Sequence, residues 1–372
     1  MSELIPISVT SVLLALLSHK TSEYDLTHYI YRRKDRFWFI VMAVAMVLFV
    51  GLRTGYNDTG TYQQIYNAIP KDVSLTDGIE WLNMGENPGF AFTNRVLVRL
   101  NFSTQSYLMF YAVVSVSIYL WFLRKYTCDL PLTVFMFVTF AGYTFTLAAI
   151  KQCMAMALCL LATDCFIKKK YIFFVLWILI ASLYHPYALM YLVIPFLTFR
   201  PWSSKTVIML VVFAIMGTLM ENLIGTIINV TDMLGENFDS SSFTGEGVNP
   251  LRLAAVSGPI LLSFITREPI RQKNDKVQNL MVNLAILNGE IMFIALFGTA
   301  NYFARLANYF LPFQALAIPY LFSLFNKSSK KLLTVGSSVC YAFFYIYSNA
   351  INESFDQHFY SITLREYLES LF

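Results

Sequence analysis

Polar and charged side chains gather directly after an apolar run near the start of the chain. Residues 52–62 read LRTGYNDTGTY and place Arg53, Asp58 and Tyr62 where the apolar run 37–51 ends. Arginine presents a planar fork of donors that matches phosphate oxygens, and a carboxylate can take a proton from a hydroxyl group. The stretch therefore has the residue types for binding an anion and for general base chemistry.

Residues of the same kinds recur between later apolar runs. Lys151 and Gln152 separate two runs, His185 lies in the sequence YHPY between two others, and Arg305 follows a late one. The polar segment 53–105 also contains the sequence ENPGF and a short amphipathic helix pattern with two arginines. The full set of candidate site residues is Arg53, Asp58, Tyr62, Glu86, Arg95, Arg99, Lys151, Gln152, His185 and Arg305.

The composition predicts an all-α polytopic membrane protein. Of the 372 residues, 57% are hydrophobic and only 13% are charged, whereas a soluble domain has roughly 25% charged residues. The mean hydropathy of +0.55 agrees. The basic residues are dispersed between apolar runs, so a nucleic-acid partner is not predicted. We expect about twelve spans, at approximately 4–18, 37–52, 106–123, 131–149, 153–167, 171–184, 186–199, 206–229, 251–266, 278–299, 306–325 and 332–350.

The distribution of lysine and arginine predicts the orientation. Six short loops carry 19 of the 27 basic residues; they are 20–36, 124–130, 168–170, 200–205, 267–277 and 326–331. Because cytoplasmic loops are enriched in Lys and Arg, these loops are assigned to the cytoplasm and both termini to the outside. The loop 231–250 has four acidic and no basic residues and is assigned outside. All the candidate site residues then lie at the extracytoplasmic face.

The topology requires a break at YHPY. The loops at 168–170 and 200–205 are both basic and are both assigned to the cytoplasm. The apolar stretch between them must therefore cross the membrane outward and cross it again back to the cytoplasm. Pro186 disfavours helical geometry at His185 and removes a backbone donor. The alternative is one long tilted helix with His185 near its middle, which would place the basic loop 267–277 outside.

We expect one transmembrane domain over residues 1–350, with the extracytoplasmic loop 53–105 between spans 2 and 3 forming part of the site. The tail, residues 351–372, is interpreted as an interfacial amphipathic helix outside the membrane. Its lipid-facing side chains would be Phe355, Phe359, Ile362 and Leu371. A chain-length regulator is a candidate partner for this tail.

Cations and one histidine at a membrane surface suit an anionic substrate with a lipid tail. In a polyprenyl diphosphate sugar donor, the diphosphate would meet Arg53, Lys151 and Arg305. Asp58 and His185 are both candidates for the base that takes the proton of an acceptor hydroxyl. Histidine is favoured because its pKa is near neutrality, and Asp58 could equally orient an arginine or hold the acceptor sugar.

Aromatic side chains and acidic pairs complete the chemical inventory. Tyr56 and Tyr62 offer faces for stacking on sugar rings. The outward loops contain no DxD or ExD pair, and the pair Glu23 and Asp25 falls on the cytoplasmic side. Neither a metal nor another cofactor is predicted, and arginines would take the role of a divalent ion.

Each candidate also has a structural explanation. Taken alone, Arg53 is more typical of a snorkelling anchor than of a ligand. Asp58 with neighbouring glycines is equally typical of a turn, and Lys151 of a loop end. His185 before proline more often caps a helix, and Arg305 could pair with an acid in the membrane.

Five sequence elements, in order, resemble the EpsG-like family of polysaccharide polymerases. GLRTGYNDTGTYQQIY resembles the segment that follows the second span of that family, and ENPGF resembles its Glu-Pro-Gly-Phe element with one asparagine inserted. AAIKQCMAMALCLLA and ASLYHPYALMYLVIP are similar to its Arg-Gln-Ala helix start and its Ala-Ser-Leu-aromatic-His segment. FARLANYF resembles its late arginine before a tyrosine. Together the elements span residues 51–310.

The resemblance implies a Wzy-type polymerase with a glycosyltransferase-C-like membrane fold. Such enzymes transfer a growing glycan from undecaprenyl diphosphate onto a lipid-linked oligosaccharide repeat at the outer face of the bacterial plasma membrane. The functional residues that carry over are Arg53, Asp58, Gln152, His185 and Arg305. Lys151 departs from the usual arginine and loses its bidentate fork.

Two other functions compete. An O-antigen ligase-like transferase would use the same residue types. A flippase or transporter of lipid-linked sugars would instead use acids and amides in the membrane, namely Glu290 or Glu221 with Asn283 and Asn288. The unusual residues gather at one face rather than at mid-membrane, and this favours an enzyme.

Overall fold

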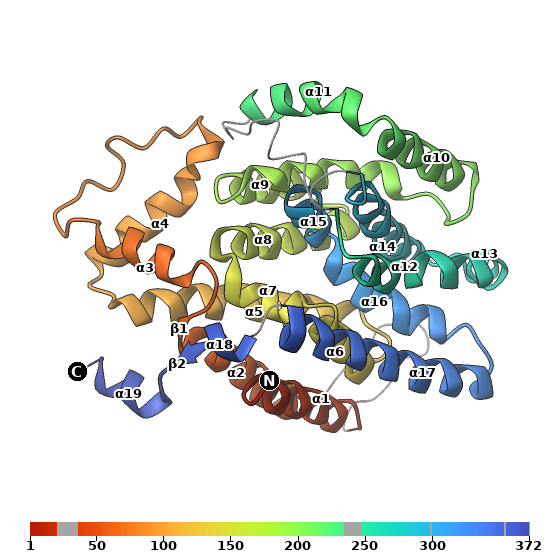
Figure 1. The fold of residues 1–372 in the computed structure, drawn as a ribbon, viewed down its shortest axis with the longest axis horizontal. Helices are drawn as coiled ribbons and strands as arrows, with labels where there is room; N and C mark the ends of the chain where they lie inside the picture. The colour runs from red at the N-terminus through yellow and green to blue at the C-terminus, as the bar shows by residue number, and fades with distance from the viewer. Residues whose placement is uncertain (21–35, 234–246, 298–299, 353–354, 372) are drawn as a thin grey trace. The chain divides into compact units, whose positions relative to one another are not determined.

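The computed structural model describes residues 1–20, 36–233, 247–297, 300–352 and 355–371. The chain is an all-α protein with two short strands in these residues (Figure 1). The predicted basic loop 20–36 and acidic loop 231–250 fall largely outside the described residues.

The helices and strands occur in the following order along the chain. They are α1 (Leu4–Lys20), α2 (Phe37–Gly51), β1 (Arg53–Gly55), α3 (Thr59–Asn67), η1 (Met84–Glu86), α4 (Pro88–Arg99), α5 (Thr104–Tyr126), α6 (Leu130–Thr139), α7 (Gly142–Ala148), α8 (Ile150–Ile167), α9 (Tyr171–Ser182), η2 (Pro186–Leu197), α10 (Ser204–Thr218), α11 (Met220–Met233), α12 (Pro250–Ile265), α13 (Arg267–Lys273), α14 (Lys276–Ile294), α15 (Ala300–Asn308), α16 (Leu311–Phe322), α17 (Lys327–Ile346), η4 (Tyr347–Asn352), α18 (Phe355–His358), β2 (Tyr360–Ser361) and α19 (Leu364–Glu369).

Several of these helices have the length and composition of membrane spans. Among the described residues, α5, α8 and α14 are long and apolar enough to cross a membrane, and the number rises to five if each of two broken helix pairs counts as one span. Six further helices are apolar but have only 10–17 residues, below the ~20 residues that a straight span requires. A multi-pass membrane protein follows, and the count of twelve and the sides of the loops stay predictions.

Three of the predicted apolar runs are interrupted in the structure. The run 131–149 divides into α6 and α7, and Ala141 between them has a φ of 63°. The run 206–229 divides into α10 and α11, and the run 306–325 overlaps α15 and α16. Hydropathy measures only apolar content. It therefore predicted one continuous span where the backbone forms two separate helices.

The break at YHPY is present. Helix α9 ends at Ser182, and the next element is the 3-10 helix η2, which begins at Pro186. Pro186 and Pro195 each lack the backbone N–H of an α-helical hydrogen bond, which fits the tighter winding of η2. Whether its arms form an outward hairpin stays a prediction.

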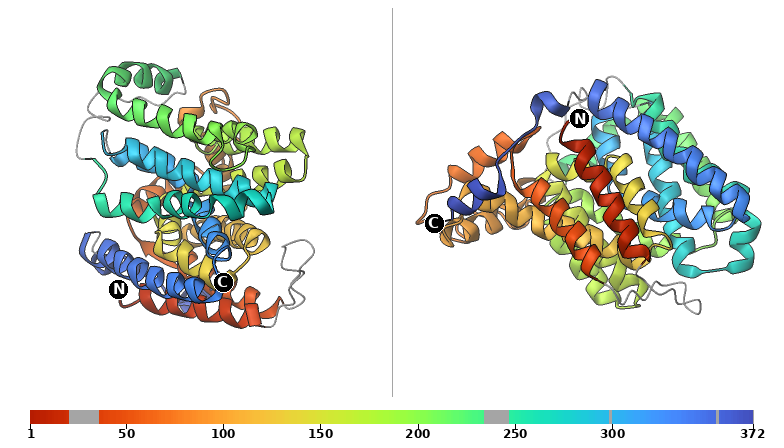
Figure 2. Two further views of the ribbon diagram at one scale, coloured as in Figure 1. Left: turned by 90° about the vertical axis from the view of Figure 1, so that its right-hand side faces the viewer. Right: turned by 90° about the horizontal axis from the view of Figure 1, so that it is seen from below.

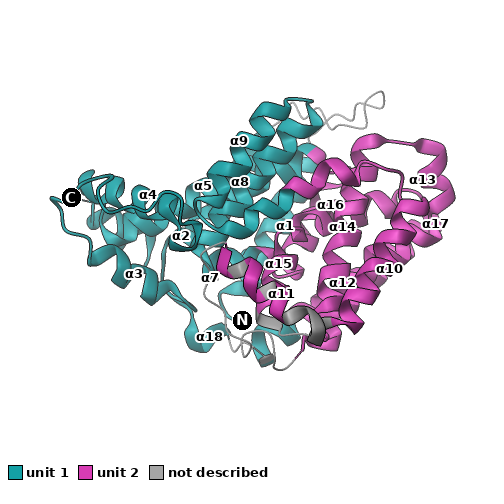
Figure 3. Ribbon diagram, turned by 90° about the horizontal axis from the view of Figure 1, so that it is seen from above, with its two compact units in different colours: residues 1–125, 143–191, 346–372 teal, residues 126–142, 192–345 magenta. Residues whose placement is uncertain are grey.

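The described chain forms two compact units that alternate along the sequence (Figure 3). Unit 1 comprises residues 1–125, 143–191 and 346–372, and unit 2 comprises residues 126–142 and 192–345. Within unit 1, α8 packs along α9, and α1 lies beside α2 (Figure 2). Within unit 2, α14 is buried along almost its whole length and packs against α10, α12, α15 and α16.

Buried amides fasten the helices of unit 2 to one another. The Asn283 side-chain nitrogen donates to the carbonyls of Leu197 (2.8 Å) and Phe199 (2.7 Å). The Gln314 amide nitrogen on α16 donates to the side-chain oxygen of Asn288 (2.8 Å), whose own nitrogen donates to the Ala307 carbonyl (2.5 Å). These polar residues therefore use their donors on protein partners, as buried amides must.

The C-terminal tail differs from the single amphipathic helix that its sequence predicts. It consists of two short helices, α18 and α19, with strand β2 between them pairing antiparallel with β1. Phe355 and Phe359, expected to face lipid, are buried. Their rings stack on each other (4.8 Å between centroids), and Phe359 also stacks on Phe49 of α2 (5.0 Å). Phe355 and Phe359 are thus covered by protein, whereas Leu371, also expected to face lipid, is exposed.

We expect Phe355→Ala to lower the free energy of unfolding by roughly 3 kcal/mol, because it leaves a cavity among aromatic rings. Phe355 is 0% exposed and packs against Tyr56 (4.9 Å between centroids). The matched control is Phe343→Ala on α17, where the side chain is 67% exposed. Thermal unfolding of the detergent-purified variants would compare them, and equal losses would contradict the buried position of the tail.

Candidate functional site

Arg53 is buried at the point where α2 ends and β1 begins. Its side chain is 1% exposed and is one of the largest fully buried side chains. Its Nη1 donates to the carbonyl of Val50 in the last turn of α2 (2.6 Å), and its Nε donates to the hydroxyl of Thr59 in the first turn of α3 (3.2 Å). The guanidinium therefore joins the end of one helix to the start of the next.

The charge of Arg53 is not neutralised within the described part of the chain. There it forms hydrogen bonds to one carbonyl and one hydroxyl and no ion pair with a carboxylate. Burial lowers its pKa to about 10, while Cys153, Tyr107 and Tyr62 partly oppose the shift. A shift of this size corresponds to an unfavourable burial of roughly 3 kcal/mol, and the group still remains protonated at neutral pH. Buried charges are normally paired, so this guanidinium is suited to binding an anion.

Helix α3 places two of the predicted residues around this arginine. Asp58 is exposed at the residue that precedes the helix, directly before Thr59. Tyr62, one turn into α3, is buried with its ring edge-on to Phe90 of α4 (5.9 Å between centroids). Tyr62 therefore packs on protein in this structure, and Asp58 keeps its carboxylate at the surface.

The first turn of α8 reaches the same group of residues. The Lys151 ammonium lies 6.0 Å from the centre of the Phe90 ring, within range of a cation–π interaction. Gln152 is buried, and the next residue, Cys153, interacts electrostatically with Arg53. Lys151 and Gln152 thus approach Arg53 and Tyr62 from a helix about ninety residues further along the chain.

The ENPGF element docks on the turn that carries His185. The Gly89 backbone N–H donates to the Leu183 carbonyl (2.8 Å). The hydroxyl groups of Thr93 and Tyr184 share a hydrogen bond (2.7 Å). His185 is half-buried next to this junction, with its ring edge-on to Tyr187 (4.5 Å). Two segments that the sequence predicted separately are therefore in direct contact.

Asn87 forms the turn within the ENPGF segment. Its φ of 54° is left-handed, a conformation that asparagine tolerates better than most residues. Helix α4 then starts with Pro88 at its first position, where proline is favoured. Glu86 precedes the turn and is exposed at the end of η1.

Arg95 and Arg99 bind the loop that connects α3 to η1. Arg95 donates to the carbonyls of Ser74 (3.0 Å) and Asp77 (2.8 Å), and Arg99 donates to the carbonyl of Val73 through both Nε (3.0 Å) and Nη2 (2.8 Å). Both arginines therefore hold the loop before α4 against that helix. Their predicted role in substrate binding stays a prediction.

Arg305 belongs to unit 2, where it is exposed on α15. Three residues later, Asn308 accepts a hydrogen bond from Arg252 of α12 (3.2 Å). Its predicted contact with a diphosphate stays a prediction. Across the described ranges, no group of three or more His, Cys, Asp and Glu residues is arranged to hold a metal ion.

Some residues of the site were not found from the sequence. Thr59 accepts from Arg53, and Leu183 accepts from Gly89. Threonine at the start of a helix is a common capping residue and leucine is common everywhere, so neither residue type identified the contact. Phe90, which contacts both Tyr62 and Lys151, carried a signal only as part of ENPGF.

Comparison with known proteins gives one match. The sequence model of the EpsG family matches residues 36–361, which include every candidate site residue. No curated protein and no solved structure matches the chain.

We expect Arg53→Met to remove function without destabilising the fold. Methionine replaces an uncompensated charge with an apolar group, so the free energy of unfolding should stay level or rise by about 1–3 kcal/mol. Thermal unfolding in detergent checks this expectation. A loss of several kcal/mol would show that Arg53 serves the fold rather than an anion.

Gly89→Ala should lower the free energy of unfolding by about 1–3 kcal/mol, the usual cost of overpacking. A Cβ at this position would lie 2.8 Å from the Leu183 Cβ and 3.1 Å from its carbonyl oxygen. Gly60→Ala in α3 is the control, because a Cβ there meets nothing within 4 Å. If both substitutions have the same effect on thermal unfolding, the docking of ENPGF on the His185 turn is wrong.

Proposed function

Because the chain belongs to the EpsG family, which is linked to exopolysaccharide biosynthesis, we propose that it is a Wzy-type polysaccharide polymerase. Its substrates would be oligosaccharide repeat units linked to undecaprenyl diphosphate. It would act at the extracytoplasmic face of the bacterial plasma membrane, within a twelve-span fold of the glycosyltransferase-C type.

The observation that supports this proposal best is the uncompensated guanidinium of Arg53. A buried cation without a carboxylate partner is costly, and a diphosphate would offset that cost with charge-assisted hydrogen bonds. Three of the five guanidinium donors are not used in its two hydrogen bonds. Lys151 adds a second positive charge 6.0 Å from the centre of the Phe90 ring.

The proposed reaction is a glycosyl transfer. A hydroxyl oxygen of the acceptor repeat forms a bond to the anomeric carbon of the growing glycan, and the bond from that carbon to the diphosphate oxygen breaks. The diphosphate leaves with the electron pair, and Arg53 and Lys151 stabilise its developing charge. The hydroxyl proton goes to a base, for which His185 and Asp58 are the candidates.

A transporter of lipid-linked sugars is the alternative from another class. Glu290 on α14 is 3% exposed, and its two carboxylate oxygens have no hydrogen-bond partner among the described residues. Intramembrane acids of this kind often belong to ion-coupling sites. Against this role, the side-chain oxygen of Asn288, the atom that would bind a cation, already accepts a hydrogen bond from Gln314 (2.8 Å).

The test is synthesis of polymer by the purified protein in detergent. The protein would receive a diphosphate-lipid-linked repeat unit from its host, and products would be resolved as a glycan ladder. We expect the wild type to form a ladder, and Arg53→Ala, His185→Ala and Arg305→Ala to reduce its rate by about 100-fold or more, as loss of a charge-stabilising group does. Lys151→Arg should retain activity that Lys151→Gln loses.

Arg365→Ala is the matched control. Arg365 is a surface cation of the tail that, among the described residues, forms an ion pair with Glu369 on its own helix (2.8 Å). Its substitution should leave the ladder unchanged. Transfer of the glycan to a different acceptor would instead indicate a ligase. No ladder from folded protein, together with passage of lipid-linked sugar across proteoliposome membranes, would favour the transporter and Glu290.

A further inference from the structure

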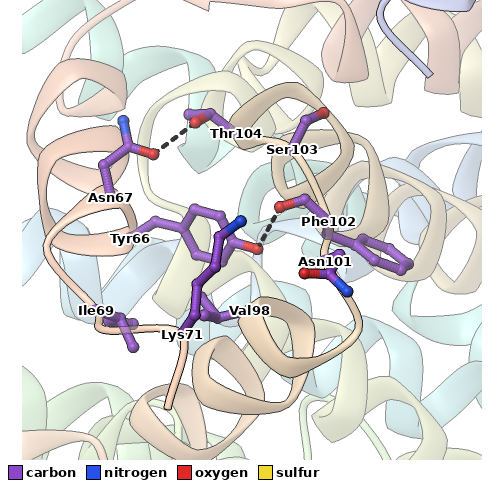
Figure 4. Close-up of a pocket in the computed structure, with 9 residues that line it drawn as sticks. All are labelled: Tyr66, Asn67, Ile69, Lys71, Val98, Asn101, Phe102, Ser103 and Thr104. Carbon is purple, nitrogen blue, oxygen red and sulfur yellow. Dashed lines mark hydrogen bonds between the residues drawn. The ribbon is translucent and has the colours of Figure 1, made fainter. Parts of the chain in front are cut away.

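Unit 1 contains a pocket of about 310 Å³ that none of the predicted site residues lines (Figure 4). It lies where the end of α3, the end of α4 and the start of α5 meet, and its lining includes Asn67, Lys71 and Asn101. Its volume is at the lower end of the range for small-molecule sites, which begins at roughly 300 Å³.

The polar groups of the pocket are mostly neutral. Asn67 and Asn101 contribute amides, Ser103 and Thr104 contribute hydroxyls, and Lys71 is the single charged residue of the lining. The Thr104 hydroxyl donates to the Asn67 side-chain oxygen (2.5 Å), so the Asn67 amide nitrogen is not part of that bond (Figure 4). Amides and hydroxyls are both donors and acceptors, which is the pattern that a ring of sugar hydroxyls requires.

A rigid aromatic wall supports the pocket. The Tyr66 hydroxyl donates to the Phe102 carbonyl (2.9 Å), and the Tyr66 ring stacks on Tyr107 of α5 (4.2 Å between centroids). Burial raises the pKa of Tyr66 to about 12, so the hydroxyl stays protonated and keeps this bond. The wall therefore fixes the loop 100–103 against α3.

Helix α3 connects this pocket to the buried arginine. Its first residue, Thr59, accepts from Arg53, and its last residue, Asn67, lines the pocket. Eight residues of α-helix separate the two by roughly 12 Å at 1.5 Å per residue. Tyr107, which stacks on Tyr66, also interacts electrostatically with Arg53. The two places are thus the opposite ends of one short helix.

We propose that this pocket is a saccharide subsite that holds a sugar of the growing glycan while its diphosphate-linked end lies at Arg53. The inference rests on the proposed polymerase function. A diphosphate is not the expected occupant, because the lining offers one ammonium and no guanidinium. An acyl chain is not expected either, because five of its nine lining residues are Asn, Lys, Ser or Thr.

The subsite is tested first by binding. Oligosaccharide released from the host polymer would be titrated into the detergent-purified protein, and binding would be followed by saturation-transfer NMR. Lys71→Ala and Asn101→Gly are the variants, and glycine preserves the left-handed backbone of Asn101, whose φ is 57°. Each should weaken binding about 5-fold or more, in line with the loss of a hydrogen bond.

Gln64→Ala, on an exposed part of α3, is the control and should bind normally. In the ladder assay, we expect Lys71→Ala and Asn101→Gly still to form the first glycosidic bond, with a KM raised about 5-fold, and to give shorter products. Arg53→Ala should instead lose the first bond. This contrast distinguishes a site that binds the glycan from the site where the glycosidic bond forms.

Unchanged binding and unchanged product length in both folded variants would overturn the subsite, as would a lack of binding to the wild type. If the wild type binds oligosaccharide through Lys71 and Asn101 but makes no ladder, the subsite stands and the polymerase proposal fails. A ladder whose length is insensitive to both variants would leave the polymerase intact and remove the subsite.

Discussion

Burial of the Arg53 guanidinium sets the local structure of unit 1. A cation that is 1% exposed must direct its donors at oxygen, and here it does so at the end of α2 through Val50 and at the start of α3 through Thr59. One side chain thus bridges the ends of two helices through hydrogen bonds. The strand β1, which begins with Arg53, also pairs with β2 of the tail. The helix end, the next helix and the C-terminal strand therefore all adjoin this buried charge.

The sequence predicted the helical class and several helices well because their apolar residues are uninterrupted. The run 37–52 corresponds to α2, which ends at Gly51 just before the buried arginine. The interruption at Ala141 could not be read from hydropathy, because the residues on both sides of it are equally apolar. For the same reason, composition alone did not separate helices of full span length from the shorter ones.

The tail shows a second limit of pattern reading. Phe355 and Phe359 are four residues apart, which places them on one face of a helix, and the sequence predicted lipid as the partner of that face. In the structure, Phe49 and Tyr56 cover the two rings instead. A periodic apolar face indicates that the face is buried, but it does not indicate whether lipid or protein buries it. The contact of Gly89 with Leu183 was hidden in the same way, since it depends on the docking of two distant segments.

The two ends of α3 differ in chemistry, and this difference has a functional consequence under the proposed reaction. Under the proposed reaction, every lipid-linked donor carries the same diphosphate. A buried, fixed cation is suited to binding a group that is the same in all substrates. Sugars differ from one glycan to another. Lys71 lies on an exposed loop, where substitutions cost little stability, and the left-handed backbone of the exposed Asn101 accepts glycine without strain. The fold can therefore alter the sugar that it recognises at one end of the helix. The hydrogen bonds that hold Arg53 at the other end stay as they are.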